Sequence, residues 1–365
     1  MKDFTLRNDT KLLFRNEPKT DLAELVAHKR ILFVYSPSAK TNGCYDDIKA
    51  AAQSGNAIFN ELCASRELEC VEAGISLAKK QGIELIIGAG GASVMDCAKL
   101  IAFGACNEVD FKDYLKGEKS SYGKEKLPLI LIPTYPSSGS EYGLGAVWAD
   151  ARTQDFGTAY GIAADIAILS PKYSIHLGAE LTAYAGLVSL VQLSASSIGD
   201  WNPVSYDVGV CVMRNVLKAL HCLKQNPQDT DAFGVILYGA ALSTSDRLGL
   251  GKEQNYAYEI YELEFIPEVL YQASYRKSLT TLFPRFLKAM AKRYEKDIKR
   301  YFSDVFGYTG EIDESVSKMI NLFESFGVNM YFQGKVSVES LKGIDYSSTL
   351  EVGEVERLIK ECLSN

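Results

Sequence analysis

The segment Ile83–Lys99, IELIIGAGGASVMDCAK, combines residue types that bind a phosphate group through backbone atoms. An apolar run ends at Gly88, a loop of glycine and alanine follows, and a predicted helix begins near Ser93. Glycines let the backbone approach a ligand closely, and a helix N-terminus offers unpaired N–H groups and the positive end of its dipole. Ser93 could cap that helix and donate its hydroxyl to the same anion. The alternative is a tight turn without a ligand, since GAGGAS does not have the GxGxxG spacing of the Rossmann fingerprint.

A second polar loop, IPTYPSSGSE, spans residues 132–141 and follows another apolar run. It places hydroxyl groups around Gly139, and these groups suit hydrogen bonds to phosphate, ribose or a carboxamide. They belong to Thr134, Ser137, Ser138 and Ser140. Taken alone, the loop is as well explained by an ordinary polar connection.

The elements that must position these loops alternate between strand and helix patterns. Short apolar runs at 30–35, 84–88 and 127–133 predict buried parallel strands. Helices are predicted at 45–55, 66–81 and 93–104, so the first half is typical of a doubly wound parallel sheet. After about Pro171 we expect only helices, at 181–197, 206–225, 232–245, 279–302, 314–326 and 352–363. A cleft between two such domains is a common substrate site.

Length, charge and composition limit the classes of protein to which this chain can belong. A chain of 365 residues predicts two domains, and the formal charge of −7 argues against a nucleic-acid partner. No apolar run reaches the roughly 20 residues of a membrane span, and the charged start lacks a secretory signal. Eight cysteines occur singly without a CxxC pair, which favours reduced thiols and a cytoplasmic location.

Together the two loops resemble the iron-containing alcohol dehydrogenase family. GGASVMDCAK at 90–99 is similar to its GGGSxxDxAK segment, and PTYPSSGSE at 133–141 is similar to its PTTAGTGSE segment. WNPVSYD at 201–207 and LFPRFLKA at 282–289 resemble two further family segments, NPxSD and LxPxWMxY. The resemblance covers nearly the whole chain in order. It implies a dehydroquinate-synthase-like fold, with an α/β dinucleotide-binding domain at 1–170 and an all-helical domain at 171–365.

The resemblance also implies a nicotinamide cofactor. Its pyrophosphate would contact the loop Gly90, Gly91, Ala92 and Ser93, with Asp96 as part of the same motif, and Thr134 and Ser138 would lie along the adenine and ribose. NAD-dependent relatives often carry an acid at the first nucleotide turn. This chain has SPSAK there, from Ser36 to Lys40, which favours NADP while leaving NAD open.

This sequence departs from the family at the positions of the metal ligands. The family holds one divalent ion with an aspartate and three histidines, but the matching stretch GLVSLVQLSAS offers Val188 or Ser189, and Gln192 or Leu193. The remaining two positions fall on Tyr261 and Tyr275, and the three histidines of the chain lie elsewhere. Zn²⁺ and Fe²⁺ prefer imidazole, thiolate or carboxylate ligands. We therefore expect a divergent member without a metal.

Tyrosines and acids crowd the stretch Asn255–Lys277 that contains the last two positions. A tyrosine whose pKa is lowered by a nearby cation can donate a proton to a carbonyl, so Tyr261 and Tyr275 are candidate catalytic residues. Arg276 and Lys277 are candidates for binding an anionic small-molecule substrate. The alternative is that these side chains only fill the volume of an abandoned metal site.

Two functions remain open from the sequence. The first is an NAD(P)-dependent oxidoreductase that interconverts a small alcohol and its aldehyde or ketone without the usual metal. The second is a catalytically inactive relative that senses a nucleotide or binds a partner. The family also makes a homo-oligomer plausible, and no membrane partner is expected.

Overall fold

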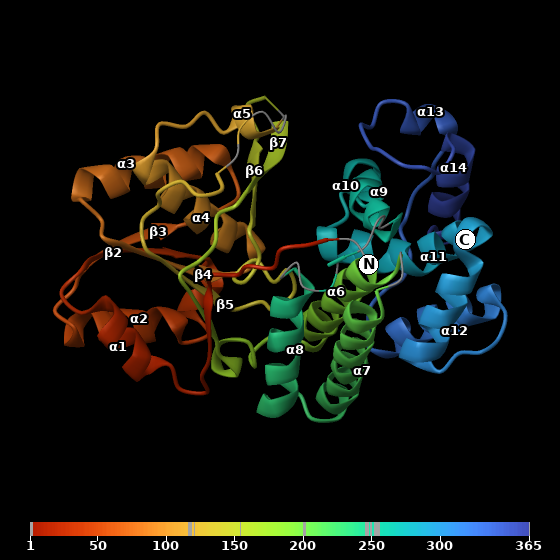
Figure 1. Cartoon of the computed structure of the whole chain (residues 1–365), viewed down its shortest axis with the longest axis horizontal. Coiled ribbons are helices and arrows are strands. Elements are labelled where there is room, and N and C mark those ends of the chain that lie inside the picture. The colour runs from red at the N-terminus through yellow and green to blue at the C-terminus, as the bar shows by residue number, and fades with distance from the viewer. Residues whose placement is uncertain are drawn as a thin grey trace. The chain divides into compact units, whose positions relative to one another are not determined.

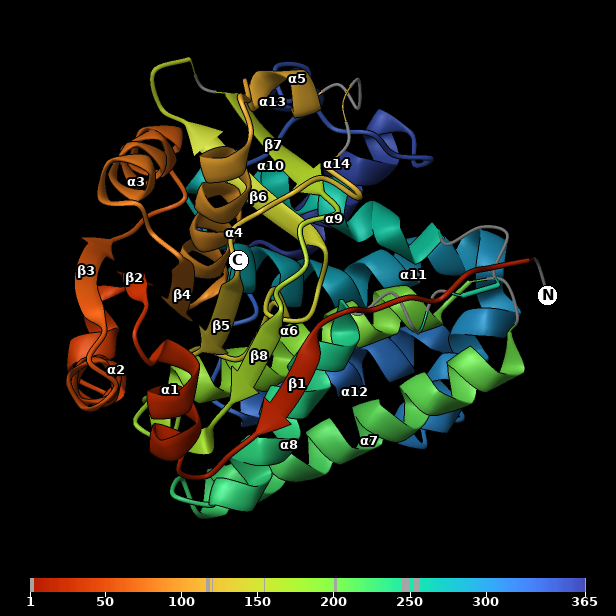
Figure 2. The same ribbon diagram turned by 60° about the vertical axis from the view of Figure 1, so that its left-hand side comes forward.

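Short aliphatic and aromatic runs form a six-stranded sheet in which neighbouring strands pair in parallel. In sheet order its strands are β1 (Lys11–Phe14), β8 (Ile166–Leu169), β5 (Leu129–Pro133), β4 (Leu85–Gly90), β2 (Arg30–Tyr35) and β3 (Ile58–Cys63), seen side by side in Figure 2. The computed structural model describes residues 3–115, 119, 121–153, 155–199, 202–244, 248, 250–251 and 256–364. Trp201, Ser245 and Asn255, which belong to predicted segments, lie outside these residues.

Alternate side chains along the central strands enter two different cores, as a pleated strand requires. Leu32 and Ile86 face one core, whereas Phe33 and Ile87 face the other. The first core lies beneath α3 (Leu68–Gln81) and α4 (Ala92–Cys106), and the second beneath α1 (Lys19–Val26) and α2 (Cys44–Ser54), as Figures 1 and 2 show. The other elements near the sheet are η1 (Pro37–Lys40), α5 (Lys112–Leu115), the antiparallel pair β6 (Gly145–Asp150) and β7 (Asp155–Tyr160), and η2 (Pro171–Tyr173).

The chain divides into two compact units. The sheet unit comprises Arg7–Leu177 and Gln228–Ser245, and the helical unit comprises Met1–Leu6, Gly178–Pro227 and Asp246–Asn365.

This division differs from a single boundary between residues 170 and 171, because α8 (Thr230–Ser243) belongs to the sheet unit. Leu237 and Ala241 of α8 pack with Leu169 at the end of β8, and a Cβ atom at Gly234 would lie 2.9 Å from the Phe14 ring. A tertiary apolar contact, which local sequence does not encode, therefore returns this helix to the sheet.

The helical unit contains no strand among its described residues, only an isolated bridge between Phe332 and Leu363. Its central helix, α6, is buried from residue 182 to residue 197. The helices are α6 (Ala179–Ser197), α7 (Pro203–Gln225), η3 (Tyr256–Glu259), α9 (Ile260–Leu263), α10 (Phe265–Tyr271), α11 (Tyr275–Tyr301), η4 (Phe302–Phe306), α12 (Ile312–Ser325), α13 (Val338–Leu341) and α14 (Val352–Glu361). A parallel-sheet unit and an all-helical unit confirm the predicted fold class.

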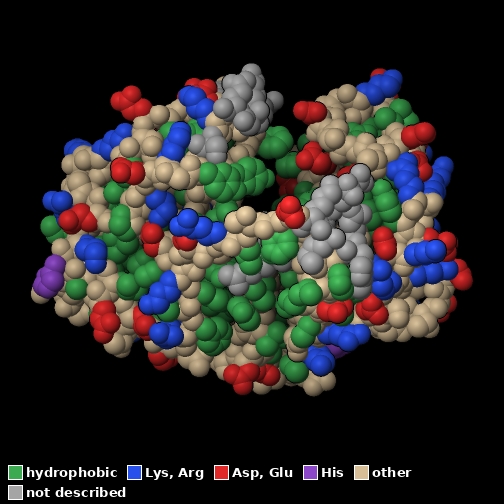
Figure 3. Space-filling model, in the orientation of Figure 1, with side chains coloured by type: hydrophobic (Ala, Val, Ile, Leu, Met, Phe, Trp, Pro, Cys, Tyr) green, Lys and Arg blue, Asp and Glu red, His purple; other side chains and the backbone are tan. Residues whose placement is uncertain are grey.

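Charged side chains of both signs are interspersed over the face shown in Figure 3. Among the described residues, every helix is too short or too polar to cross a bilayer.

Candidate active site

The glycine-rich loop joins the last residue of β4 to the first turn of α4. Gly90 pairs with Pro133 of β5, and Gly91 is the N-cap residue of α4. No side chain caps this helix, and within its first turn the Val94 N–H donates to the Gly91 carbonyl at 3.2 Å. The helix begins at Ala92, which makes Ser93 its second residue rather than the cap that we expected. The loop therefore keeps the N-terminal anion site available.

Glycine is required at position 88, where the chain packs against α4 and β5, whereas there is open space beside Gly91. A Cβ atom at Gly88 would lie 2.7 Å from Ala98 Cβ and 2.8 Å from Leu131 Cδ2, so glycine lets α4 pack directly on the sheet. At Gly91 an added Cβ atom would lie 3.8 Å from Tyr135 Cβ. Ser93 is exposed. An open backbone surface at a helix N-terminus fits a phosphate or pyrophosphate group.

The second loop is fastened to the first. The Thr134 N–H donates to the Gly90 carbonyl at 2.9 Å, and the buried Thr134 side chain lies beside β4. Ser138 is half-buried, and its Oγ accepts a hydrogen bond from the Ser140 N–H at 3.2 Å. Thr134 and Ser138 are thus held at the same end of the sheet as the glycine-rich loop.

Asp96 has a different position from the one that we predicted. Its carboxylate is buried and accepts hydrogen bonds from Ser140 Oγ at 2.5 Å and from the Val147 N–H at 3.1 Å. One acceptor oxygen therefore holds Ser140 of the second loop, and the other holds β6. We conclude that Asp96 is a positioning residue rather than a group that faces a cofactor.

Lys99 lies about one helical turn after Asp96 in α4, and its ammonium group is fully buried. It donates to the carbonyl oxygens of Gly143 at 2.9 Å and Gly145 at 2.7 Å. Burial lowers the pKa of Lys99 to about 8, although the nearby carboxyl groups of Asp96 and Glu141 oppose this shift. This role could not be predicted from the sequence, because a lysine in a helix usually lies on the solvent-exposed face.

Glu141 is the third member of a buried group of ionisable side chains, together with Asp96 and Lys99. Its Oε1 atom has no hydrogen-bond partner among the described residues, whereas Asp96 has two donors. Burial raises the pKa of Glu141 to about 7, with a smaller contribution from the Asp96 charge. Burial raises the pKa of Asp96 as well, and the Lys99 charge lowers the pKa of both carboxyl groups. With two donors, Asp96 is the better stabilised carboxylate, whereas Glu141 retains its proton below neutral pH.

Glu141→Gln is expected to flatten the dependence of stability on pH. A raised folded-state pKa means that the Glu141 contribution is fully present below pH 4.5 and is lost as pH rises to about 7. Between these values, the wild-type protein should lose roughly 2–3 kcal/mol more unfolding free energy than the variant. Urea unfolding across this pH range measures the difference. The exposed control Glu24→Gln should follow the wild type, and parallel curves for Glu141→Gln would contradict the assignment.

The first nucleotide turn carries Ser36 and Lys40 at the end of β2. The Ser36 N–H donates to the Ala89 carbonyl at 3.3 Å, so this turn lies beside β4. The exposed Lys40 ammonium lies 5.2 Å from the ring centre of Tyr35 and 5.0 Å from that of Tyr45. A hydrogen bond with Tyr35 raises the pKa of Lys40, and the Glu61 carboxylate, which accepts from Tyr45 Oη, adds to the effect. The turn thus offers a cation with an acid close by.

In the helical unit, one side chain from each of the four elements α6, η3, α9 and α11 forms what we call the tyrosine cluster: Gln192, Tyr258, Tyr261 and Tyr275. Gln192 Nε2 of α6 donates to Tyr275 Oη at the start of α11, at 3.3 Å. Tyr258 Oη donates to Ser196 Oγ at 3.4 Å, and the rings of Tyr258 and Tyr261 are 5.8 Å apart.

The Gln192–Tyr275 contact favours one of the two registers of α6 that the sequence left open, the one with Val188 and Gln192. Ser189 of the other register donates through Oγ to the Ala185 carbonyl of its own helix at 2.9 Å. Two of the positions predicted to replace metal ligands, Gln192 and Tyr275, are therefore in contact.

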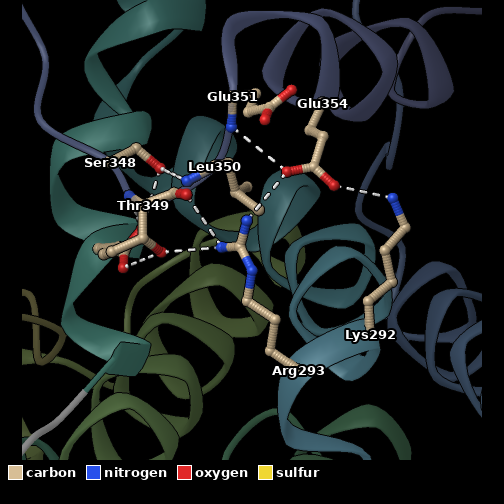
Figure 4. A network of polar contacts seen from close by, with 8 residues as sticks. Lys292, Arg293, Ser348, Thr349, Leu350, Glu351 and Glu354 are labelled. Atoms are coloured by element: carbon tan, nitrogen blue, oxygen red, sulfur yellow. Dashed lines mark hydrogen bonds and ion pairs between the residues drawn. The ribbon is translucent and has the colours of Figure 1, made fainter.

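The segment that carries Tyr258 and Tyr261 is anchored through the neighbouring residue Glu259. Its carboxylate accepts from the Thr349 N–H at 2.8 Å and from Thr349 Oγ1 at 2.7 Å. Arg293 of α11 donates to the Thr349 carbonyl and pairs with Glu354, which also binds Lys292 (Figure 4). This network joins η3, α11 and the start of α14 around the cluster.

The two candidate catalytic tyrosines are half-buried, and their pKa values are raised, whereas we expected them to be lowered. Burial raises the pKa of Tyr275, and the nearby Glu264 carboxylate raises it further. Burial also raises the pKa of Tyr261, with contributions from Tyr275 and Tyr258. Burial is the main reason, and the neighbouring acid and phenols add to it instead of a cation that would oppose it. Both phenols therefore remain protonated at neutral pH, as a proton donor must.

Arg276 and Lys277 lie against different aromatic rings. The Arg276 guanidinium is 5.9 Å from the ring centre of Tyr184, and Lys277 Nζ is 5.7 Å from that of Phe332. Both side chains are half-buried. The structure does not bring the two cations together on one ring.

The donor set of the tyrosine cluster does not fit a divalent metal. An amide and neutral phenols replace carboxylate and imidazole, and the Gln192 amide is already engaged by Tyr275. Over the described part of the chain, no group of three or more histidine, cysteine, aspartate or glutamate side chains is placed to hold a metal ion.

Comparisons with known proteins agree with this geometry in the sheet unit. Residues 9–171 match the family described as iron-containing alcohol dehydrogenase. The chain is 25% identical over 332 residues to the probable NADH-dependent butanol dehydrogenase 1 of Bacillus subtilis, covering 87% of this chain and 84% of that protein. It is 23% identical over 346 residues to an NADPH-dependent aldehyde reductase of Escherichia coli, covering 90% and 88%.

Solved structures share the fold over the full length. The NADH-dependent butanol dehydrogenase A of Thermotoga maritima aligns with a TM-score of 0.86 at 22% identity, covering 100% of this chain and 99% of that chain. A sulfoacetaldehyde reductase of Bifidobacterium kashiwanohense, solved with NAD+, aligns with a TM-score of 0.83 at 14% identity and covers 100% of both chains.

Proposed function

We propose that this chain, which the comparisons support as a member of the iron-containing alcohol dehydrogenase family, is an NAD(P)-dependent oxidoreductase. It would interconvert a small alcohol and its aldehyde or ketone, and it would do so without the family's metal. The names of its relatives support an oxidoreductase with a nicotinamide cofactor. The observation that carries the proposal is the open glycine-rich loop at the uncapped N-terminus of α4.

The sheet unit would hold the cofactor. The N–H groups of Gly91, Ala92 and Ser93 would bind its pyrophosphate, while Thr134 and Ser138 would lie along its adenine and ribose side. Lys40 favours NADP through a 2′-phosphate, although the nearby Glu61 carboxylate works against a second negative charge. When bound, the nicotinamide supplies or accepts the hydride. The buried Asp96 contributes by holding Ser140 of the second loop, and Lys99 by holding Gly143 and Gly145, which follow this loop.

The helical unit would supply the proton. Gln192 donates its amide N–H to Tyr275 Oη, which leaves the phenol hydrogen free for an acceptor such as a carbonyl oxygen. A phenol with a raised pKa is still acidic relative to an alcohol, so transfer to a developing alkoxide is downhill. Tyr261 would support Tyr275 by excluding water and anions from its surroundings. Arg276 would attract an anionic substituent of the substrate.

Tyr275→Phe is expected to lower kcat/KM for carbonyl reduction by about 10²-fold, because it removes the proton donor. The dissociation constant for NAD(P)H should stay unchanged, since the cofactor loop belongs to the sheet unit. Steady-state kinetics and a separate nucleotide titration measure the two effects.

Tyr308→Phe is the matched control, because this half-buried tyrosine of the helical unit lies outside the cluster. Tyr261→Phe should give a smaller loss than Tyr275→Phe. If Tyr275→Phe kept the activity of the control, Tyr275 would not be the donor.

The loss of the metal-binding side chains favours a second candidate, a catalytically inactive nucleotide-sensing or partner-binding protein. This candidate predicts stabilisation by NAD(H) or NADP(H) in a thermal-shift titration together with no turnover on any aldehyde or ketone tested. Turnover that Tyr275→Phe abolishes would eliminate it.

A further inference from the structure

Two cysteines face each other where α3 packs closely on α4. Both helices follow parallel strands, and small residues bring them together: a Cβ atom at Gly74 would lie 2.3 Å from Ile101 Cδ1. Cys70 and Cys97 each precede this contact pair by four residues, one helical turn. The two thiols are therefore placed opposite one another in the register of the helix pair, and both belong to the same apolar core.

The environments of the two thiols differ in the way that a reactive pair requires. Cys97 is buried, whereas Cys70 is half-buried and lies near the exposed Cys63, with Cys70 Sγ 3.9 Å from the Cys63 carbonyl oxygen. A hydrogen bond from Cys97 lowers the pKa of Cys70 to about 6, and hydrogen bonds from Ser65 add to this effect although burial opposes it. The same hydrogen bond and burial raise the pKa of Cys97. A partly exposed thiolate beside a buried thiol is typical of a redox-sensitive site.

We propose that Cys70 and Cys97 are a redox pair that a hydroperoxide converts into a disulfide. The Cys70 thiolate attacks the terminal peroxide oxygen, the O–O bond breaks, and the leaving alkoxide or hydroxide takes up a proton. Cys70 is thereby oxidised to a sulfenic acid. The Cys97 sulfur then attacks the Cys70 sulfur, its proton passes to the departing hydroxide, and water leaves. Two thiols and one hydroperoxide give one disulfide, one alcohol or water, and one water.

The disulfide would act on the glycine-rich loop through α4. The two sulfur atoms must approach to about 2.05 Å, which pulls α4 toward α3. Cys97 follows Asp96, which holds the second loop, and α4 begins at the glycine-rich loop itself. Oxidation should therefore weaken nucleotide binding by about tenfold, and reduction should restore it. This consequence rests on the proposed function, whereas formation of the disulfide does not.

Peptide mapping of the full-length protein tests the pair directly. Reduced protein is treated with one equivalent of hydrogen peroxide, alkylated and digested with trypsin without reductant. Cleavage after Arg66, Lys79 and Lys80 separates the peptides that contain Cys63, Cys70 and Cys97. We expect a cross-linked pair of the Cys70 and Cys97 peptides that lacks two hydrogen atoms and is dissociated by dithiothreitol. A Cys63–Cys70 cross-link, or a Cys70 peptide that stays reduced, would overturn the proposal.

Two variants separate the steps. Cys97→Ala should stop at a sulfenic acid on Cys70 that dimedone traps, and Cys70→Ser should leave Cys97 reduced. Cys211→Ser removes an exposed thiol of the helical unit and should not change the map. If Cys97→Ala does not fold, the wild-type map and Cys70→Ser still decide whether the disulfide forms.

A titration with NADPH before and after oxidation tests whether the disulfide weakens nucleotide binding. Reduced protein that binds no nucleotide would refute the proposed function while leaving the cross-link result intact.

Discussion

Lys99→Met is expected to lower the unfolding free energy of the sheet unit by about 3–5 kcal/mol, the usual cost of leaving a buried charge without its partner. The Lys99 ammonium is fully buried and donates to the carbonyls of Gly143 and Gly145. Its removal leaves both acceptors unsatisfied and leaves the Asp96 carboxylate without the opposite charge. Methionine retains the length and apolar stem of the side chain, so the loss reports the charge and its hydrogen bonds.

Denaturant unfolding of three proteins makes this prediction specific. Lys80→Met removes an exposed lysine from α3 and should change stability little. The double variant Lys99→Met/Asp96→Asn removes both charges of the pair and should recover part of the loss. If Lys99→Met were as stable as Lys80→Met, the bonds of the Lys99 ammonium to Gly143 and Gly145 would not stabilise the sheet unit.

Gly139→Ala is expected to cost about 2–5 kcal/mol of unfolding free energy, because backbone strain and overpacking act at the same position. Gly139 has a φ of +66°, a conformation that alanine rarely adopts. A Cβ atom there would lie 2.2 Å from the Ala240 carbonyl oxygen and 2.4 Å from Thr244 Oγ1. The carbonyl belongs to α8 and cannot move away alone. The second loop must therefore shift, and nucleotide affinity should fall with stability.

Gly123→Ala separates the two causes. Gly123 has a similar φ of +72°, but a Cβ atom there would meet nothing within 4 Å. Its substitution should cost only the backbone strain, about 1 kcal/mol. Equal losses for the two variants, measured by thermal and denaturant unfolding, would show that the contact with α8 does not constrain Gly139.

Much of the sheet unit could be predicted because its central strands are buried on both faces. Continuous apolar runs marked β2, β4 and β5, with bounds that differ by at most two residues from the structure. The edge strand β3 was missed because its side chains, as in IFNELC, mix polar and apolar types. The placement of α8 was missed because only tertiary packing against Leu169 and Tyr142 assigns it to the sheet unit.

The candidate sites also contain a local part, which the sequence predicts, and a part that depends on contacts between distant residues. A loop such as Gly90–Ser93 is local, so its residue types and spacing predict it. The Gln192–Tyr275 contact joins residues 83 positions apart, and two registers of α6 were compatible with the sequence. The roles of Asp96, Lys99 and Glu141 depend on burial, which the motif does not reveal. Burial also reversed the pKa direction predicted for Tyr275, and the nearby Glu264 carboxylate adds to the shift.

Carbonyl-dependent oxidation of NAD(P)H by metal-free protein tests the central claim most directly. The purified chain is dialysed against a chelator, its zinc and iron contents are determined, and it is assayed with NADH and NADPH against a panel of small aldehydes and ketones. We predict turnover that added Zn²⁺ or Fe²⁺ does not increase and that Tyr275→Phe loses. Protein that binds the nucleotide but oxidises it with no carbonyl compound, or only after a metal is added, would contradict the account.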